Sequence, residues 1–234
     1  MYRQFGNSDY RSASVGRAHE DLTVARSGQL DALIALERIG ARLSFSRNDE
    51  IYAEGDNSDY WYKVVSGTVR ICKLLADGRR HIAEFAFAGE SFGLDHTSER
   101  VYAAEAVDDV IAMRFRRAAT EQLSDQNPMV ARLLRDTMLR DLTSAHGRTL
   151  LLGRMNAPER VAAFLLEMLE RRERTKSLDL PMSRVDIADY LGLTVETVCR
   201  TLSLFRRDGM IAIPSPHRIE LLDRASLEGI GEAY

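Results

Sequence analysis

The chain has 234 residues, of which 45% are apolar and 29% are charged, which fits a soluble globular protein of one large or two ordinary domains. Its formal net charge is −3, which argues against nucleic-acid binding through bulk positive charge, so any such binding must rest on local geometry. No apolar run approaches the roughly 18 residues of a membrane helix, and residues 1–28 lack the apolar core of a secretory signal. We expect a flexible arm at residues 1–28, no membrane contact and a cytoplasmic location.

Glycine turns divide residues 29–125 into short segments. Gly55, Gly67, Gly78 and Gly89 follow one another at intervals of 12, 11 and 11 residues. The runs between them, such as "YWYKVV" and "RHIAEFAF", are rich in β-branched and aromatic residues. Short strands with turns every 8–12 residues or so indicate an antiparallel sandwich or barrel, and the Asp-Gly pair in "ADGR" favours a type I′ hairpin.

Residues 126–153 change to a helical pattern. Asn127 can cap a helix, and Pro128 suits its first position. Small and apolar residues then recur every three or four positions. They form one stripe: Val130, Leu134, Met138, Leu142, Ala145, Thr149 and Leu152. The stripe could pack on the chain's own sheet, but a helix of about 25 residues is longer than the globular average, which favours a homodimer seam with a period near 3.5.

Residues 154–234 begin again with helix signals of their own. Ser183 and Asp186 form a plausible capping box, and Gly192 is a natural end for the helix that they start. Thr194 is the candidate cap of a second helix. After that helix, "MIAIPSPHRIELLD" is typical of two short strands around a proline turn. A helix, a tight glycine turn, a second helix and a hairpin are the order of a winged helix-turn-helix.

These segments predict an α+β fold. It has an N-terminal antiparallel β-roll at residues 29–125, a long dimerisation helix at 126–153 and a C-terminal winged helix-turn-helix at 154–234. The two cysteines, Cys72 and Cys199, lie far apart, and the five histidines show no HxH or HxxxH spacing. We therefore expect no metal and no cofactor.

The second helix of the predicted helix-turn-helix has two distinct faces. Its apolar residues recur at helical spacing and should face the core: Val195, Val198, Leu202 and Phe205. Glu196 and Arg200 share the opposite face. They could form an ordinary i,i+4 ion pair, worth a few tenths of a kcal/mol or so. Their place in the first turns after the glycine favours base contacts, because arginine can bind guanine and glutamate can accept from cytosine.

The stretch "IADYLGLTVETVCRTLSLFRRDGMI" resembles the helix-turn-helix signature of the Crp/Fnr superfamily of bacterial transcription regulators. The Fnr-like branch carries a Glu-x-x-Ser-Arg motif, which stands here as Glu196 to Arg200 with Cys199 in place of serine. The resemblance covers nearly the whole chain: the β-roll with its turn glycines, the long helix and the winged C-terminal domain. The β-roll would then be similar to a cyclic-nucleotide-binding domain.

The resemblance implies a homodimer that binds an inverted repeat of TTGAT-like half-sites in double-stranded DNA, with RNA polymerase as a partner. Glu196 and Arg200 would read the G·C step, and Val195 would at most pack against a thymine methyl group. Arg184, Thr194 and Thr197 match positions that hold DNA phosphates. On the wing, His217 and Arg218 are weaker phosphate candidates.

The sensor motifs of the superfamily are incomplete in this chain. Cyclic-AMP-binding members carry a Gly-Glu pair and an Arg-Ser pair, but here Leu94 follows Gly93 and Val101 follows Arg100. The N-terminal region has no cysteines for an iron–sulfur cluster. The chain therefore resembles the FixK-type subgroup, whose members are active without a small effector. They control microoxic and anaerobic respiration and nitrogen-metabolism genes, including nitrogen fixation, mainly as activators.

Two other functions remain as alternatives. One is a cyclic-nucleotide-responsive regulator of the Crp type. The other is a cupin-like enzyme, since the roll shares that architecture. A metal-dependent cupin or a haem sensor would have only His81 and His96 of the roll as histidine ligands.

Cys199 is a candidate redox site. It is expected beside Arg200 at the edge of the DNA face, and a neighbouring cation favours the reactive thiolate. Oxidation to a sulfenic or sulfinic acid would place a polar or negative group against DNA phosphates and weaken binding. The alternative is an inert, half-buried cysteine.

Overall fold

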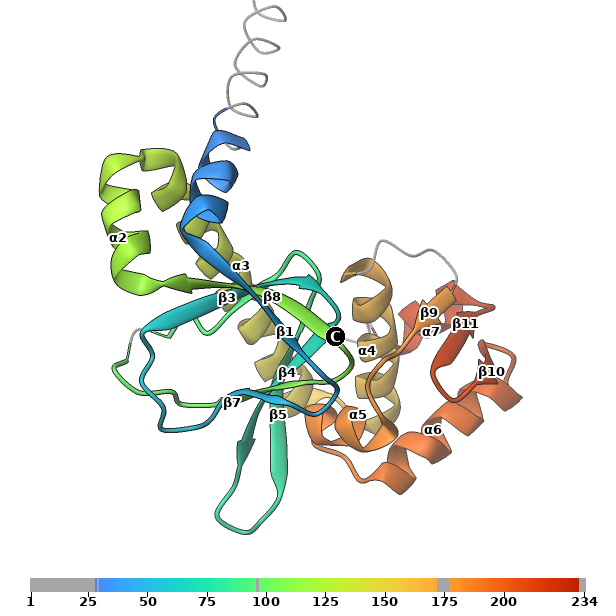
Figure 1. Cartoon of the computed structure of the whole chain (residues 1–234). Coiled ribbons are helices and arrows are strands. Elements are labelled where there is room, and N and C mark those ends of the chain that lie inside the picture. The colour runs from blue at the N-terminus through green and yellow to red at the C-terminus, as the bar shows by residue number, and fades with distance from the viewer. Residues whose placement is uncertain (1–27, 29, 96, 172–176, 232–234) are drawn as a thin grey trace, which may run out of the picture.

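The computed structural model describes residues 28, 30–95, 97–171 and 177–231 (Figure 1). The predicted arm at residues 1–28 lies outside these ranges apart from Gly28. The described part has an N-terminal β-roll, a long helix and a C-terminal helical domain with a small sheet, which confirms the predicted α+β fold. None of the helices in these ranges is both long and apolar enough to cross a membrane.

The β-roll consists of two four-stranded antiparallel sheets. Its strands are β1 (Gly40–Phe45), β2 (Glu50–Tyr52), β3 (Tyr60–Ser66), β4 (Thr68–Leu74), β5 (Arg80–Phe87), β6 (Ser91–Phe92), β7 (Ala103–Ala106) and β8 (Val110–Arg116). The first sheet has the order β1-β8-β3-β6 and the second the order β2-β7-β4-β5. Tyr62 and Val64 of the first sheet and Val69 and Ala104 of the second share one buried cluster, so the core of the roll lies between the sheets.

The four turn glycines occupy the left-handed region that favours glycine. Gly55, Gly67, Gly78 and Gly89 have φ values of 88°, 88°, 82° and 92°. At Gly67 the requirement is also steric, because an added Cβ would lie 2.4 Å from the carbonyl oxygen of Asp109. The spacing of these glycines therefore located four turns of the roll correctly.

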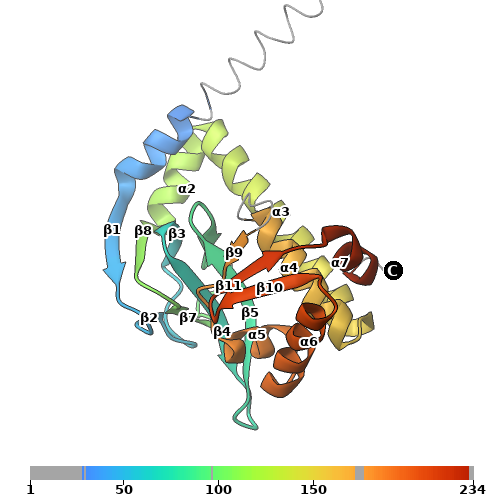
Figure 2. The ribbon, with the colours of Figure 1, turned by 90° about the vertical axis from the view of Figure 1, so that its right-hand side faces the viewer.

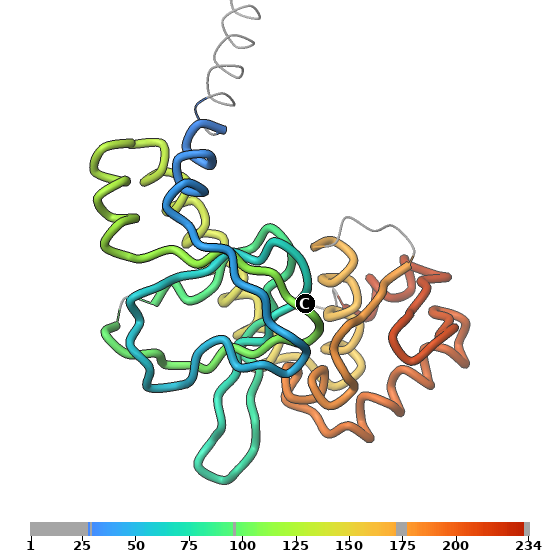
Figure 3. Tube along the Cα trace, viewed as in Figure 1, coloured from blue at the N-terminus to red at the C-terminus, as the bar shows by residue number. Residues whose placement is uncertain are grey.

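The β4–β5 hairpin differs from the prediction in its turn. A type I′ turn needs positive φ at both central residues, but Gly78 alone has it and Asp77 does not. The Gly78 amide donates to the Leu75 carbonyl, and the Leu75 amide donates to Arg79, which makes a three-residue loop. The hairpin extends well beyond the body of the roll (Figure 3).

Two helical segments cover the outer face of the first sheet and were not predicted. They are residues 30–39 and α2 (Arg117–Gln126). Trp61 stacks on Phe115 with ring centroids 4.2 Å apart, and both pack with the 30–39 helix and Val130 in one buried cluster. Residues 117–126 contain only a few apolar side chains, so hydrophobic periodicity gives little sign of this helix.

The long helix is α3 (Pro128–Arg154), close to the predicted range. The Asn127 side chain caps it by accepting from the Met129 amide at 3.0 Å. Val130 is fully buried against the roll of its own chain and is not available to a partner. Met138 and Leu142 expose 49% and 52% of their surface. The remaining residues of the predicted dimer seam are half-buried or exposed: Leu134, Ala145 and Thr149.

The C-terminal domain contains the predicted order of helix, glycine turn, helix and hairpin, together with further elements. Its elements are α4 (Ala157–Arg171), β9 (Ser177–Asp179), α5 (Arg184–Leu191), α6 (Val195–Arg207), β10 (Ile211–Ser215), β11 (Arg218–Leu221) and α7 (Arg224–Gly231). The segment between α4 and α5 contains β9, which pairs with β11 and gives the sheet order β10-β11-β9. A local pattern could not reveal this strand, because three residues carry too little periodicity.

The roll and the C-terminal domain share a hydrophobic core. Phe85 of β5 lies in the same buried cluster as Phe164, Tyr190 and Phe205 of the C-terminal helices. The ring centroids of Phe85 and Tyr190 are 5.2 Å apart. The contact between α5 and β5 is visible from the side, where α5 lies at the base of the roll (Figure 2). The two domains are therefore packed together rather than merely tethered.

Candidate DNA-binding interface

The first helix of the helix-turn-helix begins and ends at the predicted residues. The Ser183 hydroxyl accepts from the Asp186 amide at 3.1 Å, and the Asp186 carboxylate accepts from the Ser183 amide at 3.0 Å. This reciprocal pair is the predicted capping box of α5. Gly192 closes α5 in the left-handed conformation with φ of 61°. The local sequence thus determines the sharp turn that separates α5 from α6.

The second helix, α6, presents the expected two faces. The Thr194 hydroxyl caps it by accepting from the Thr197 amide at 3.2 Å, and the two hydroxyl oxygens lie 3.0 Å apart. The residues predicted to face the core are buried, with Val195 half-buried at the start: Val198, Leu202 and Phe205. The opposite side is exposed: Glu196, Arg200, Ser203 and Arg207.

Glu196 and Arg200 are exposed side by side on α6 and do not pair with each other. The ordinary i,i+4 ion pair was the alternative to base reading, and the described residues show no such pair. Neither side chain has a hydrogen-bond partner within the described part of the chain. An arginine and a glutamate held this way have all their donors and acceptors available for an external partner.

Arg184, at the first position of α5, connects the helix-turn-helix to the wing. Its Nη2 donates to the Pro216 carbonyl at 3.1 Å, and burial lowers the pKa of its guanidinium below the usual value. The Cys199 thiol is exposed and close enough to Arg184 to interact with it electrostatically. The sequence pointed to Arg200 as the cation near this thiol and missed Arg184, because the two helices meet only in the folded domain.

The wing lies between β10 and β11, and it carries the two weaker phosphate candidates. His217 Nδ1 lies 3.0 Å from the Leu180 carbonyl oxygen, which can only accept, so Nδ1 carries a proton. Arg218 Nε pairs with Glu220 at 3.2 Å. Both residues are exposed, but each already has a partner in its own chain. Arg184, Thr194, Thr197, His217 and Arg218 all belong to α5, the start of α6 or the wing.

The β-roll holds a cavity of about 450 Å³ between its second sheet and helices α3 and α5. The polar and aromatic residues that line it include Tyr52, Glu84, Asp141, Arg148 and Tyr190. Acidic side chains therefore face this space together with a single arginine among its lining residues.

Arg100 stands beside this cavity with both terminal nitrogens occupied. One donates to the Gly93 carbonyl and to the Asp95 carboxylate, each at 2.8 Å. The other donates to the Tyr60 carbonyl, and the guanidinium lies 4.1 Å from the centroid of the Tyr52 ring. The sequence flagged Arg100 but missed Asp95, which supplies a carboxylate where an anionic ligand would otherwise bind.

The structure describes one of the two histidines of the roll, His81, so a site that uses both His81 and His96 lies outside what it describes. His81 lines the cavity, whereas His96 lies outside the described residues. Across the described ranges, no three histidine, cysteine or carboxylate side chains are grouped in a way that could hold a metal ion.

Comparison with known families matches both halves of the chain. The family described as "Crp-like helix-turn-helix domain" matches residues 159–230, and "Cyclic nucleotide-binding domain" matches residues 42–127. The first range contains α5, α6 and the wing, and the second contains the β-roll.

Individual relatives match nearly the whole chain. The nitrogen fixation regulation protein FixK of Bradyrhizobium diazoefficiens is 39% identical, over 90% of this chain and 91% of the relative. The transcriptional activatory protein AadR of Rhodopseudomonas palustris is 34% identical, over 84% of each. The structure of FixK2 from Bradyrhizobium japonicum is 41% identical, with a TM-score of 0.79, over 82% of this chain and 97% of that chain.

Glu84 is the most perturbed carboxyl group of the cavity. Burial raises its pKa from 4.5 to about 7, with Asp141 and Glu90 adding to the rise and Arg148 and Arg171 opposing it. Its nearest cation, Arg148 Nη1, is 3.9 Å away. The folded state therefore holds this proton more tightly than the unfolded chain does.

The free energy of unfolding should consequently fall as the pH rises from about 4.5 to about 7. Glu84→Gln removes the buried charge and should stabilise the protein by about 1–3 kcal/mol at pH 8, with little effect at pH 5. Urea unfolding at both pH values measures this, with the exposed Glu121→Gln on α2 as control. Equal effects of Glu84→Gln at both pH values would contradict the assignment.

Proposed function

The chain belongs to the Crp/Fnr family of transcription regulators and is a FixK-like member, and from this we propose that it binds TTGAT-like inverted repeats as a homodimer. The observation that carries the proposal is the pair of exposed, unpaired side chains on α6, Glu196 and Arg200. They follow a left-handed glycine turn and a threonine cap, where a recognition helix places its base-reading residues.

The proposed reading of DNA assigns different tasks to different residues. Arg200 would donate to guanine, Glu196 would accept from cytosine, and Val195 would contact a thymine methyl group. Arg184, Thr194 and Thr197 would bind phosphates, as would His217 and Arg218 on the wing more weakly. Arginine supports such roles because its planar guanidinium can make two parallel hydrogen bonds.

Substitutions should separate these tasks. Glu196→Ala and Arg200→Ala should each reduce discrimination at the G·C step by about 1–3 kcal/mol. Arg184→Ala should weaken binding to all sequences and lower the slope of log affinity against log salt by about one. Fluorescence anisotropy with a TTGAT palindrome and its G·C variants measures both, and Glu121→Ala on α2 is the control. If Arg200→Ala keeps full discrimination, α6 does not read the base.

The apolar residues exposed on α3 support the dimer. Met138, Leu139, Leu142 and Leu150 each expose about half of their surface on one long helix. Exposed apolar patches of this kind mark association surfaces. A dimer also matches an inverted repeat, because each subunit then reads one half-site.

Leu142→Glu should disrupt this seam. A carboxylate at an apolar contact is costly to desolvate, so we expect the dimer dissociation constant to rise roughly 100-fold or more. Sedimentation velocity at micromolar concentrations measures it. The matched control is Leu222→Glu, since Leu222 is 61% exposed and lies outside α3. A wild-type chain that sediments as a monomer, or a Leu142→Glu variant that stays dimeric, would refute the α3 seam.

We also propose that the regulator works without a small-molecule effector. The support is that Arg100, the residue that could receive a phosphate in the roll, is held by Asp95 and two backbone carbonyls. A nucleotide would have to displace a buried ion pair, at a cost of several kcal/mol or so. The competing function, a Crp-type regulator that responds to a cyclic nucleotide, is supported by the match to a cyclic nucleotide-binding domain. The relatives are regulators, which removes support from the cupin-like enzyme.

The relatives suggest a physiological role. Those named nitrogen fixation regulation protein and transcriptional activatory protein support an activator of genes for nitrogen metabolism. Control of respiration when oxygen is scarce is what the FixK-type resemblance implies. Such an activator would act in the cytoplasm and contact RNA polymerase.

We further propose that oxidation of Cys199 weakens DNA binding. Its thiol is exposed on α6, one position before Arg200 in the sequence, and is within electrostatic range of Arg184, a proposed phosphate contact. The other thiol, Cys72, is buried, and burial raises its pKa to about 11, so it should react far more slowly with peroxide.

Peroxide should therefore lower the affinity of the wild type for the palindrome, and a thiol reductant should restore it unless oxidation has passed the sulfenic stage. Cys199→Ser retains Cys72 and should keep at least about 80% of its binding under the same treatment. Anisotropy titrations before and after peroxide measure the difference. An equal loss in the serine variant would rule Cys199 out.

A further inference from the structure

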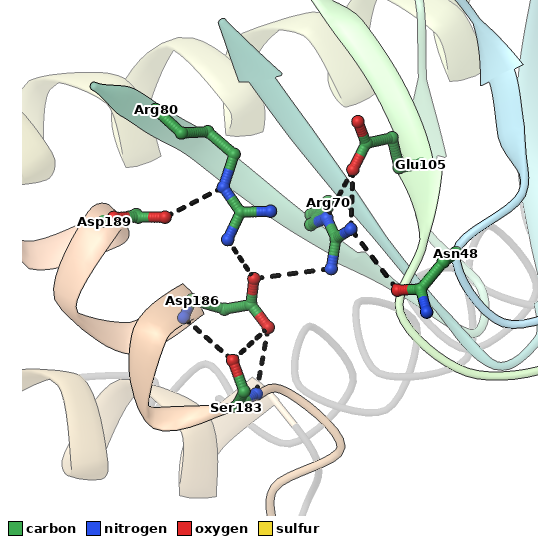
Figure 4. A network of polar contacts seen from close by, with 7 residues as sticks. All are labelled: Asn48, Arg70, Arg80, Glu105, Ser183, Asp186 and Asp189. Carbon is green, nitrogen blue, oxygen red and sulfur yellow. Dashed lines mark hydrogen bonds and ion pairs between the residues drawn. The ribbon is translucent and has the colours of Figure 1, made fainter. Parts of the chain in front are cut away.

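A cluster of charged residues joins the roll to the first helix of the helix-turn-helix (Figure 4). Arg80 of β5 is bound to two carboxylates of α5. Its Nε donates to Asp189 Oδ2 at 2.8 Å, and its Nη2 donates to Asp186 Oδ1 at 2.5 Å. One side chain of the roll thus holds two consecutive turns of α5.

Arg70 of β4, the strand next to β5, approaches the same carboxylate from the face of the sheet that meets α5. Its Nη1 lies 3.3 Å from Asp186 Oδ1. Its Nε and Nη2 lie 2.7 Å and 2.6 Å from Glu105 Oε2 on β7, and Nη2 also donates to Asn48 at 3.5 Å. Glu105 and Asn48 therefore fix Arg70 in the roll, and Arg70 presents its remaining nitrogen to α5.

Asp186 is the shared centre of this cluster. Its Oδ1 accepts hydrogen bonds from both Arg70 and Arg80. Its Oδ2 accepts from the amide and hydroxyl of Ser183 at 3.0 and 2.8 Å. Although burial favours the neutral acid, hydrogen bonds from Ser183 and the charges of Arg70 and Arg80 lower the pKa of Asp186 below its usual value. The carboxylate that caps α5 is therefore ionised at neutral pH and bound to the roll.

The ion pairs add direction to a contact that is otherwise apolar. Phe85 on Tyr190 and the surrounding apolar residues hold the domains together, but apolar contacts tolerate sliding and rotation. Hydrogen-bonded ion pairs have a strict geometry. The Asp186 side chain is only 6% exposed, so a displacement that removed its arginines would leave a buried carboxylate without a cation.

We propose that the four residues Arg70, Arg80, Asp186 and Asp189, here called the latch, position the recognition helix for DNA. In a dimer, two recognition helices must meet half-sites about one helical turn, roughly 34 Å, apart. That distance is fixed only if each α6 is fixed relative to its own roll and α3. The latch does this through α5, which precedes α6 by one tight turn. The inference rests on the proposed function, and it makes Arg70 and Arg80 positioning residues rather than DNA contacts.

The test uses Arg80→Gln, which leaves the cap of α5 and every residue of α6 unchanged. A half-site, the palindrome, and a palindrome with two extra central base pairs are titrated with the full chain. We expect the affinity for the palindrome to fall about tenfold, because the arrangement of the domains that fits both half-sites would be populated only about a tenth of the time. The preference for native over lengthened spacing should shrink, and half-site affinity should stay within about twofold. The double variant Arg70→Gln/Arg80→Gln should lose more palindrome affinity and more of the spacing preference than Arg80→Gln alone.

The matched control is Arg79→Gln. Arg79 neighbours Arg80 in the same hairpin, but its exposed guanidinium pairs with Asp77 of the hairpin itself. This variant should behave as the wild type on all three DNAs. If Arg80→Gln keeps the wild-type spacing preference, or if its half-site affinity falls as far as its palindrome affinity, the latch does not position α6.

Hydrogen exchange without DNA separates the latch from the proposed function. Backbone amides of β5 and α5 should exchange at least about threefold faster in Arg80→Gln than in Arg79→Gln. Equal exchange would overturn the latch even if DNA binding is confirmed. Faster exchange in a chain whose wild type binds no TTGAT palindrome would support the latch and refute the proposed function alone.

Discussion

The packing of α5 against β5 is the contact on which the rest of the structure depends. α5 turns into α6 within a few residues, so whatever holds α5 also orients the side chains that would meet DNA. Phe85 and Tyr190 supply the apolar part of this contact, and Asp186 supplies the charged part. Because Asp186 also caps α5, the same carboxylate stabilises the helix and attaches it to the roll. Local structure and domain arrangement are therefore coupled in one side chain.

The sequence predicted the local features of this site well. Ser183 with Asp186, Gly192 and Thr194 act through neighbours within three or four residues, and the structure has all of them as expected. The two faces of α6 followed from helical periodicity, and the turns of the roll followed from its glycines. Such features depend on short-range geometry, which a pattern of residue types describes directly.

The features that the sequence did not reveal depend on distant partners. Arg70 and Asp186 are 116 residues apart, and nothing in either neighbourhood marks them as a pair. The short strand β9 is defined by its partner β11, and Arg184, which is within electrostatic range of Cys199, stands on the other helix of the helix-turn-helix. The turn at Gly78 also differs from expectation, because its loop has three residues instead of two. Tertiary contacts decided each of these cases.

In the roll, two backbone carbonyls and Asp95 occupy both terminal nitrogens of Arg100, the residue that could receive the phosphate of a ligand. Asp95 holds Arg100, and the arginines on the far side of the second sheet hold α5. In a regulator that needs an effector, ligand binding supplies the free energy that shifts the domains into their active arrangement. In this chain the ion pairs between the roll and α5 would supply that free energy without a ligand. The domain arrangement that binds DNA would then be the resting one.

The most direct measurement is a titration of a TTGAT palindrome with the purified wild-type chain at physiological salt, without and with cyclic nucleotides. The account predicts binding at least about 1,000-fold tighter than to a scrambled duplex with no small molecule present, unchanged when cyclic AMP or cyclic di-GMP is added. Binding that stays non-specific until a nucleotide is added would contradict it.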